Sequence, residues 1–348
     1  MNARGHKAFL AAAKGLDLAA RAKIAGVPLI EMNLGSGFHP FQDMSDLRQL
    51  KNIIQSQSID IVHCHRGKEH WLAATLAATG GLKQPIVRTR HVVLPLRGHV
   101  FNKWLFRNHV DKVICVSKAT ARSLDRLSPA IDSKVAIIYS AVDQQRFQPT
   151  RRSEEWRRAR GLSPDDLLVG LIARIQSIKG QRIFFKSASL LASQFPTMRF
   201  LVSGAGKPHH FEIMSRNAAR LGLEDRFLLE PWMDDIETAI ASMDISVIAS
   251  LGSEGSSRIL YESWASGVPV IGTEVGCLPE LVNGEIGALV KPGDAEALAA
   301  AINVLARDSD LRKRRAAEGL QWVKEHHTID RWISDTVSVY ETAVGQTR

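Results

Sequence analysis

Residues 245–273 read ISVIASLGSEGSSRILYESWASGVPVIGT, and this stretch decides the fold. An apolar run at 245–249 leads into a turn rich in glycine and serine. A helical pattern follows at 257–266, and a second apolar run closes the unit at 268–273. This order predicts two parallel strands joined by a crossover helix. The stretch therefore predicts an α/β fold built on a parallel sheet.

The turn between this strand and this helix has the composition of an anion site. Gly255 lets the backbone approach a ligand closely, and Ser256 and Ser257 add hydroxyl donors. The first backbone N–H groups of a helix are free, and the helix dipole favours negative charge there. The turn is therefore a candidate phosphate-binding site.

The same alternation runs through the whole chain and restarts once. Strands are also expected at residues 7–12, 27–32, 59–64, 86–90, 112–116, 135–138, 167–172, 198–203 and 227–229. Further helices are expected at residues 43–57, 68–79, 181–195, 209–221, 234–242, 295–306 and 328–344. We expect two doubly wound Rossmann-like sheets with a ligand cleft between them, at the carboxyl ends of the strands.

The length of 348 residues exceeds one ordinary core and fits two domains. The first domain is expected at residues 1–148 and the second domain at 165–327. The charged residues 149–164 between them are expected to form a linker, or an exposed helix within it. The helix expected within 328–348 either ends the second domain or crosses back to brace the first.

Composition excludes several classes of protein. Apolar residues make up 45% of the chain, which is enough to bury a core and excludes global disorder. Three cysteines without CxxC spacing exclude a disulfide scaffold, argue against structural zinc and favour a reducing compartment. No apolar run approaches the roughly 20 residues that span a bilayer, and no signal-peptide layout begins the chain. We therefore expect a cytoplasmic protein.

The net charge of +9 lies on one half of the chain. Residues 1–150 carry 21 lysines and arginines against 10 aspartates and glutamates, whereas residues 151–348 carry 24 against 26. This asymmetry predicts an acidic partner for the first half, with phosphate groups, anionic lipid and nucleic acid as the candidates. A solvated basic surface is the plainer alternative. Aromatic residues make up only 6% of the chain, which argues against a nucleic-acid groove.

Two carboxylates bracket the glycine-serine turn, Glu254 before it and Glu262 within the helix. Eight helical residues rise about 12 Å, which matches the span from a sugar past a diphosphate to a ribose. A carboxylate accepts two hydrogen bonds from a vicinal diol. On spacing alone, two ordinary surface glutamates explain the pair as well.

Loops after two other expected strands also carry ligand-binding residue types. Arg174 and Lys179 follow the strand at 167–172, where a basic pair neutralises a diphosphate leaving group. Gly204 and Gly206 follow the strand at 198–203 as a lone G-x-G, which is often only a tight turn. Each signal by itself also fits a solvated loop.

In combination, these segments resemble the retaining GT-B glycosyltransferases of family 4. Glu254 to Glu262, followed by ASGVPVIGTEVGCLPE at 265–280, is similar to the family's E-x7-E signature. Arg174 to Gly180 resembles its G-R…K-G element, with Ala173 in the usual place of glycine. The other similar segments are SGAGKP at 203–208, IYSAVDQQRF at 138–147 with Ser140 where asparagine is usual, and residues 60–65 and 89–91. The resemblance covers nearly the whole chain in the family's order.

The resemblance implies a GT-B fold and a role for each candidate residue. Glu262 would bind the ribose and Glu254 the transferred sugar. His91 would contact that sugar or its developing charge, or act as a general acid, although a satisfied strand-end histidine is the plainer reading. Phosphate would be bound by Gly255, Ser256 and Ser257. The leaving diphosphate would be stabilised by Arg174 and Lys179 in place of a metal ion. The nucleotide site would be lined by Gly204, Gly206, Trp232 and Met233. Trp232 and Met233 also fit plain core positions.

The implied activity is that of a retaining hexosyltransferase without a tightly bound cofactor or a required metal. The donor would be a UDP-, GDP- or ADP-sugar, and the acceptor a glycan or a lipid-linked, lipopolysaccharide-type molecule. Two alternatives stay open. One is a sugar-nucleotide epimerase or hydrolase on the same fold, and the other is an impaired nucleotide-sugar-binding protein.

The beginning of the chain departs from the family pattern. Members normally start with a strand, a Gly-rich loop and a helix that ends in A-R-G-H, whereas here residues 3–6 carry those letters. We expect either a start assigned too late or a truncated enzyme. In both cases the first sheet should contain an exposed strand position, which is an aggregation liability.

Residues 91–109, HVVLPLRGHVFNKWLFRNH, combine apolar and basic side chains. An aromatic and basic amphipathic helix suits an anionic membrane surface. The alternative is a helix that faces the core and has solvated basic residues. The segment therefore predicts peripheral binding to the inner face of a membrane through the first domain.

Overall fold

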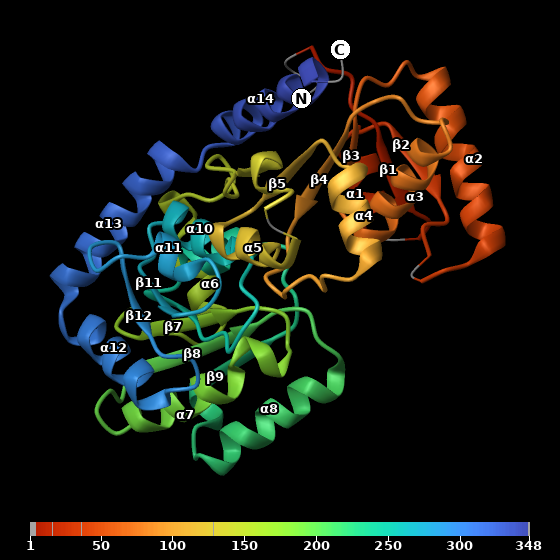
Figure 1. The fold of residues 1–348 in the computed structure, drawn as a ribbon. Helices are drawn as coiled ribbons and strands as arrows, with labels where there is room; N and C mark the ends of the chain where they lie inside the picture. Colours follow the sequence, from red (N-terminus) through yellow and green to blue (C-terminus); the bar gives the residue numbers. More distant parts are fainter. Residues whose placement is uncertain (1–4, 16, 36, 128, 347–348) are drawn as a thin grey trace.

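The computed structural model of the chain describes residues 5–15, 17–35, 37–127 and 129–346, and it forms two lobes of parallel strands and helices (Figure 1). The first lobe contains β1 (Leu10–Ala13), α1 (Asp17–Ile24), β2 (Leu29–Met32), α2 (Pro40–Ser56), β3 (Val62–Cys64), α3 (Gly67–Ala78), β4 (Ile86–Arg90), α4 (Val100–Asn108), β5 (Lys112–Cys115), α5 (Lys118–Arg122) and β6 (Val135–Ile137).

The rest of the chain builds the second lobe and ends in a helix that returns to the first. Its elements are α6 (Glu154–Arg158), β7 (Leu167–Ile172), α7 (Gln181–Leu191), β8 (Met198–Ser203), α8 (Pro208–Arg220), β9 (Phe227–Glu230), α9 (Ile236–Ala241), β10 (Ile245–Ile248), α10 (Arg258–Ala265), β11 (Val270–Thr273), α11 (Leu278–Leu281), β12 (Gly287–Val290), α12 (Ala295–Arg307), α13 (Ser309–His326) and α14 (Ile329–Gln346).

The second sheet is parallel throughout, with the strand order β12-β11-β10-β7-β8-β9. Successive side chains of a strand point to opposite faces. Accordingly, Leu168 belongs to a buried cluster with Leu260 and Trp264 of α10, whereas Val169 belongs to a second cluster with Phe184 of α7. Both faces are therefore covered by helices, which explains why these strands read as continuous apolar runs.

The first lobe divides its strands between two sheets. β3, β4, β5 and β6 form one parallel sheet in that order, and β1 and β2 form a separate parallel pair. Leu47 and Leu50 of α2 and Trp71 of α3 pack against the buried clusters of both sheets. The two sheets therefore share one helical layer. Among the described residues, β1 pairs only with β2 and β3 only with β4, so each has a strand edge without a ladder partner. Part of the A-R-G-H segment, residues 3 and 4, lies outside the described residues.

The elements of the second lobe that were not predicted from the sequence include β12 and α13. β12 has the sequence GALV, and glycine and alanine are poor strand formers. α13 has only Gly319 and Val323 buried, so it lacks an apolar stripe. Gly319 lies so close to Trp264 that a Cβ would be 2.4 Å from the indole Cδ1. Packing of this helix on α10, rather than its own pattern, therefore holds it in place.

The segment expected as a linker packs tightly against the second lobe. Trp156 of α6 contacts the core beneath α10. The neighbouring Arg157 is only 1% exposed and donates hydrogen bonds to the carbonyl oxygens of Ser242 at 2.7 Å and Asp166 at 2.6 Å. This charged sequence without an apolar stripe therefore carries a buried arginine whose two Nη atoms donate to backbone carbonyls.

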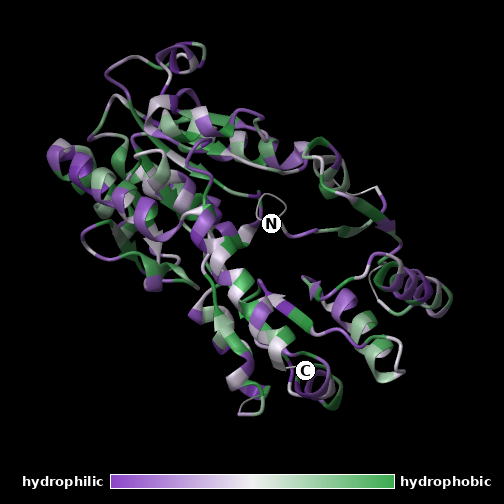
Figure 2. Cartoon of the chain, turned by 90° about the horizontal axis from the view of Figure 1, so that it is seen from above, coloured by the Kyte–Doolittle hydropathy of each residue, from purple (hydrophilic) through white to green (hydrophobic). Residues whose placement is uncertain are grey.

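Helix α14 packs against the first sheet. Val339, Tyr340 and Ala343 contact a buried cluster that includes Val87 of β4 and Ile114 of β5. The blue helix leaves α13 and ends beside the red and orange first lobe (Figure 1). In Figure 2, hydrophobic residues gather in the strands and hydrophilic residues on the outward helices, as expected for sheets buried between helical layers.

Candidate functional site

The candidate site lies where the strand order of the second sheet reverses. The chain runs outward from β7 to β8 and β9 and then crosses to β10 on the other side of β7. Crevices at the carboxyl ends of strands at such a switch point are the usual ligand sites of open α/β sheets. The loops after β7 and after β10 flank this point, and they carry six of the twelve site residues predicted from the sequence.

Close backbone contacts hold these two loops together. The backbone N–H of Leu251 donates to the carbonyl of Ile178 at 2.8 Å. Gly180 has a φ of +74°, and a Cβ there would lie 1.9 Å from the carbonyl oxygen of Ala249. Any side chain at this position would push the loops apart, so the K-G pair is needed to bring Lys179 to the switch point.

Lys179 and Glu254 form an ion pair across the switch point. The ammonium of Lys179 and the hydroxyl of Ser250 both donate to Oε1 of Glu254. The side chain of Glu254 is almost fully buried and that of Lys179 is 16% exposed. The structure therefore joins two residues to which the sequence assigned separate roles, and it adds Ser250, which the sequence analysis missed.

The turn before α10 has the backbone geometry of a ligand loop. Ser253 and Ser257 have positive φ values of 54° and 36°, which are unusual for residues other than glycine. Ser257 is the N-cap of α10, yet its side chain makes no capping bond, and its buried Oγ has no hydrogen-bond partner among the described residues. The first N–H groups of α10 therefore receive no cap from the side chain of Ser257. Uncapped N–H groups at a helix start are a suitable binding site for an anion.

Glu262 lies farther along α10, beside the segment that joins the lobes. A small cavity of about 100 Å³ is lined by Glu262, Arg258, Arg146 and Asp143, among others. Nη2 of Arg258 donates to Oε1 of Glu262 at 3.0 Å. Burial raises the pKa of Glu262 above the usual value of a glutamate, against the opposing charge of Arg258.

The predicted glycine loop runs beside the loop after β7. A Cβ on Gly204 would lie 1.9 Å from the carbonyl oxygen of Ala173, and one on Gly206 would lie 2.7 Å from Cγ1 of Ile175. Both glycines therefore serve close packing of the two loops. The neighbouring Arg174 is exposed at the carboxyl end of β7.

Trp232 and Met233 follow β9, at the same edge of the sheet. Trp232 is 52% exposed, so it is available to a ligand, whereas Met233 packs against the second-lobe core. Sδ of Met233 lies 3.9 Å from Nη2 of Arg160, whose guanidinium binds the carboxylate of Glu230. Of the two alternatives left open by the sequence, Met233 fits the core position and Trp232 does not.

His91 brings the first lobe to the site. Its backbone carbonyl lies so close to Gly255 that a Cβ on the glycine would be 2.2 Å from the oxygen. Its ring stacks on His65, with His65 Nδ1 3.2 Å from His91 Nε2. Burial, with help from the charges of His65 and Arg88, lowers the pKa of His91 to about 4. The ring is therefore neutral at ordinary pH, which suits a hydrogen-bonding role better than that of a general acid.

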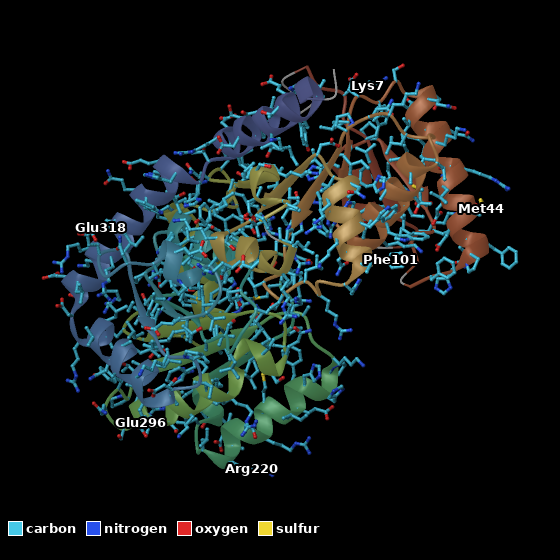
Figure 3. All side chains as sticks on the ribbon, viewed as in Figure 1. Lys7, Met44, Phe101, Arg220, Glu296 and Glu318 are labelled. Atoms are coloured by element: carbon cyan, nitrogen blue, oxygen red, sulfur yellow. The ribbon has the colours of Figure 1, made fainter. Side chains whose placement is uncertain are left out.

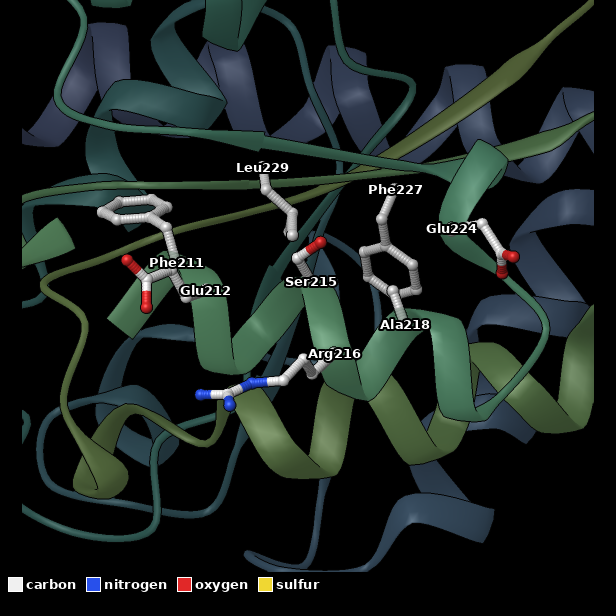
Figure 4. Close-up of a pocket in the computed structure, with 8 residues that line it drawn as sticks. All are labelled: Phe211, Glu212, Ser215, Arg216, Ala218, Glu224, Phe227 and Leu229. Atoms are coloured by element: carbon white, nitrogen blue, oxygen red, sulfur yellow. The ribbon is translucent and has the colours of Figure 1, made fainter. Parts of the chain in front are cut away.

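Two further observations concern ligands. Among residues that the structure describes, no group of three or more histidine, cysteine, aspartate or glutamate side chains is arranged to hold a metal ion. A cavity of about 680 Å³ opens between α8 and β9, lined by Phe211, Arg216 and Phe227 among others (Figure 4). None of the predicted site residues lines it, so it is separate from the switch-point site.

The comparisons with known proteins agree with this fold. The structure of a glycosyltransferase from Rickettsia africae ESF-5 superimposes with a TM-score of 0.88 at 22% identity, covering 99% of this chain and 92% of that one. Anabaena Alr3699/HepE, solved in complex with UDP-glucose, gives a TM-score of 0.77 at 20% identity, covering 93% of this chain and 87% of that one. The fold is α/β, with the two Rossmann-like domains of GT-B glycosyltransferases.

Sequence comparisons give the class of enzyme. Residues 1–146 match the family model described as Glycosyltransferase Family 4, and residues 166–308 match the one described as Glycosyl transferases group 1. The lipopolysaccharide core biosynthesis mannosyltransferase LpsB of Rhizobium meliloti (strain 1021) is 29% identical over 70% of this chain and 68% of its own length. The protein is a glycosyltransferase of the GT-B fold.

Proposed function

We propose that this glycosyltransferase moves a hexose from a nucleotide-sugar to a lipid-linked, lipopolysaccharide-type acceptor with retention of anomeric configuration. The observation that carries the proposal is the uncapped N-terminus of α10 beside Lys179 at the switch point. This arrangement stabilises a diphosphate as it leaves. With such stabilisation, the acceptor attacks the face from which the diphosphate departs, and no covalent nucleophile is required.

The donor roles follow from the positions of these residues around the switch point and along α10. Gly255, Ser256 and the first N–H groups of α10 bind the diphosphate, and exposed Arg174 adds charge to it. Glu262 accepts hydrogen bonds from the ribose hydroxyls. Exposed Trp232 lines the base. Glu254, with the hydrogen-bonding His91 on the opposite lobe, contacts the transferred sugar.

The relatives support the substrate class. LpsB is named as a lipopolysaccharide core mannosyltransferase, and HepE was solved with UDP-glucose. These names favour a hexose carried by a nucleotide as donor, with UDP-, GDP- and ADP-sugars all to be tested. No metal ion is part of the proposed chemistry, since Lys179 and the α10 N-terminus supply the positive charge.

A nucleotide-sugar panel tests this proposal. One donor should raise the melting temperature of the protein by mass action and should yield a glycosylated product only when acceptor is present. Glu262→Ala should abolish that shift, whereas Glu274→Ala, which changes an exposed glutamate of the same lobe, should keep it. Release or isomerisation of the sugar without acceptor would identify a hydrolase or epimerase instead. Binding without any turnover would identify an impaired binding protein.

We also propose that the first lobe docks on the inner, cytoplasmic face of an anionic membrane. Phe41 at the start of α2 is 94% exposed, and Val100 and Phe101 of α4 are 81% and 64% exposed. Both helices begin beyond the carboxyl ends of their strands, and Met44 and Phe101 lie toward the same end of the lobe (Figure 3). The net positive charge of residues 1–150 complements anionic lipid. No helix in the described part of the chain is long and apolar enough to cross a bilayer.

A vesicle-binding assay tests this docking. The protein should sediment with vesicles of phosphatidylcholine and phosphatidylglycerol at low salt, less so at high salt, and not with phosphatidylcholine alone. Phe101→Ser should weaken the binding severalfold, whereas Leu190→Ser, which changes a residue of the second lobe that is 41% exposed, should not. Equal binding by all three proteins, or none at low salt, would refute the docking surface.

A further inference from the structure

The carboxylate of Glu280 in the second lobe binds the first lobe close to the candidate site. Glu280 belongs to α11 of the second lobe, and its side chain is 8% exposed. Its Oε2 accepts the backbone N–H of Lys118 at 2.8 Å and its Oε1 accepts that of Ala119 at 2.5 Å. Both donors are the first residues of α5, in the first lobe. Glu280 ends the segment 265–280 that resembles the family signature, but the resemblance implied no role for it.

Two side chains from outside the second sheet complete this contact. The hydroxyl of Tyr139 donates to Oε2 of Glu280 at 2.9 Å, and Nη2 of Arg122 lies 3.5 Å from Oε1. The carboxylate also lies at the positive end of the α5 helix dipole. The next N–H of α5, that of Thr120, is bound by the side chain of Ser117 within the first lobe. The start of α5 is therefore capped jointly by both lobes.

The same contact is connected to the sugar and phosphate residues. Three residues before Glu280, the N–H of Cys277 donates to the carbonyl of Glu254 at 2.8 Å. On the other side of the interface, Cγ2 of Thr120 in α5 would lie 3.6 Å from a Cβ on Gly255. These contacts connect Glu254 to α5 through α11 and Glu280. α5 in turn lies against the turn at Gly255.

We propose that Glu280 is an interdomain positioning residue: its carboxylate caps α5 and holds the lobes in the arrangement that brings His91 to the turn before α10. The kinetic test of this inference rests on the proposed function, whereas its tests by hydrogen exchange and X-ray scattering do not. The partner it recognises is the helix start of the other lobe. Glu280 touches neither donor nor acceptor, so it acts on transfer only through the relative position of the lobes.

The geometry explains why a carboxylate is required. Two N–H groups and a hydroxyl are divided between two acceptor oxygens. The amide of glutamine offers one acceptor oxygen and turns an NH₂ group toward a donor. Glu280→Gln therefore keeps the volume of the side chain, removes its charge and breaks one of the two backbone contacts.

Glu280→Gln tests the inference in the full chain, with Glu285→Gln, an exposed glutamate nearby, as the matched control. Backbone amides of residues 118 and 119 should exchange faster with deuterium by at least about tenfold. X-ray scattering should show a broader distribution of dimensions. In kinetics, kcat should fall about tenfold or more, whereas nucleotide affinity should stay within about twofold of the parent, because the nucleotide residues lie in the second lobe.

Tyr139→Phe supplies a second, milder variant should Glu280→Gln fold poorly. It removes one donor to Glu280 and leaves both backbone contacts, so the effects should be smaller in the same directions. Unchanged exchange at residues 118 and 119 in a folded Glu280→Gln protein would overturn the inference, as would equal losses of kcat and nucleotide affinity. If the parent chain transfers no sugar, the proposed function fails, while the exchange and scattering measurements still decide the role of Glu280.

Discussion

Lys179→Ala is expected to lower the rate of sugar transfer at least about 100-fold. The ammonium lies at the switch point, on the carboxylate expected to face the transferred sugar and beside the turn expected to bind the diphosphate. Negative charge on the diphosphate grows as the sugar leaves, so its stabilisation acts on the transition state more than on the bound donor. The loss should therefore appear mainly in kcat, measured with saturating donor. Lys186→Ala, which changes an exposed lysine of α7, should transfer normally.

The same substitution leaves the buried Glu254 without its cation. Removing one partner of a buried ion pair costs about 3–5 kcal/mol of unfolding free energy, so Lys179→Ala should also melt earlier. The double variant Lys179→Ala with Glu254→Ala tests this cost in stability, because it removes the uncompensated charge. It should regain much of the stability and none of the transfer, since it lacks both groups expected to act on the donor. Recovery of transfer along with stability would show that neither Lys179 nor Glu254 acts directly on the donor.

Alternation of apolar strands and amphipathic helices predicted every strand of the described residues except β12, but it did not predict that the strands of the first lobe divide between two sheets. β4, β7 and β8 begin and end at the predicted residues. β12 was not predicted because its sequence, GALV, has no strand preference of its own and becomes a strand through pairing with β11. α13 was not predicted because close packing of Gly319 on Trp264, rather than an apolar stripe, holds the helix in place.

The residue types of the candidate site could be predicted, but their contacts could not. Lys179 and Glu254 are 75 residues apart, and spacing along the chain says nothing about an ion pair between two loops. Glu280 was missed for the same reason, since its partners are backbone N–H groups of the other lobe, which have no sequence signature. The low pKa of His91 depends on burial and on neighbouring charge, both of which arise only in the folded chain.

Gly255→Ala is the second change expected to have a large effect. A Cβ at this position would lie 2.2 Å from the carbonyl oxygen of His91 and 3.2 Å from its carbonyl carbon, both backbone atoms. Real Cβ atoms do not approach that closely, so either the turn before α10 or the strand-end loop of the first lobe must move by about an ångström. Displacements of that size at a reacting centre cost about 100-fold in rate.

Gly252→Ala is the matched control for this change, because it adds the same methyl group to the same loop. A Cβ on Gly252 meets only the flexible side chain of Ile178, at 3.6 Å, which is ordinary contact. Gly252→Ala should therefore keep nearly full transfer and Gly255→Ala should lose it, with similar melting temperatures for both. Gly255→Ala should also weaken nucleotide binding if the turn moves, and leave it intact if the first lobe moves away. Normal transfer by Gly255→Ala would mean that the lobes do not need the close backbone contact at His91 for the reaction.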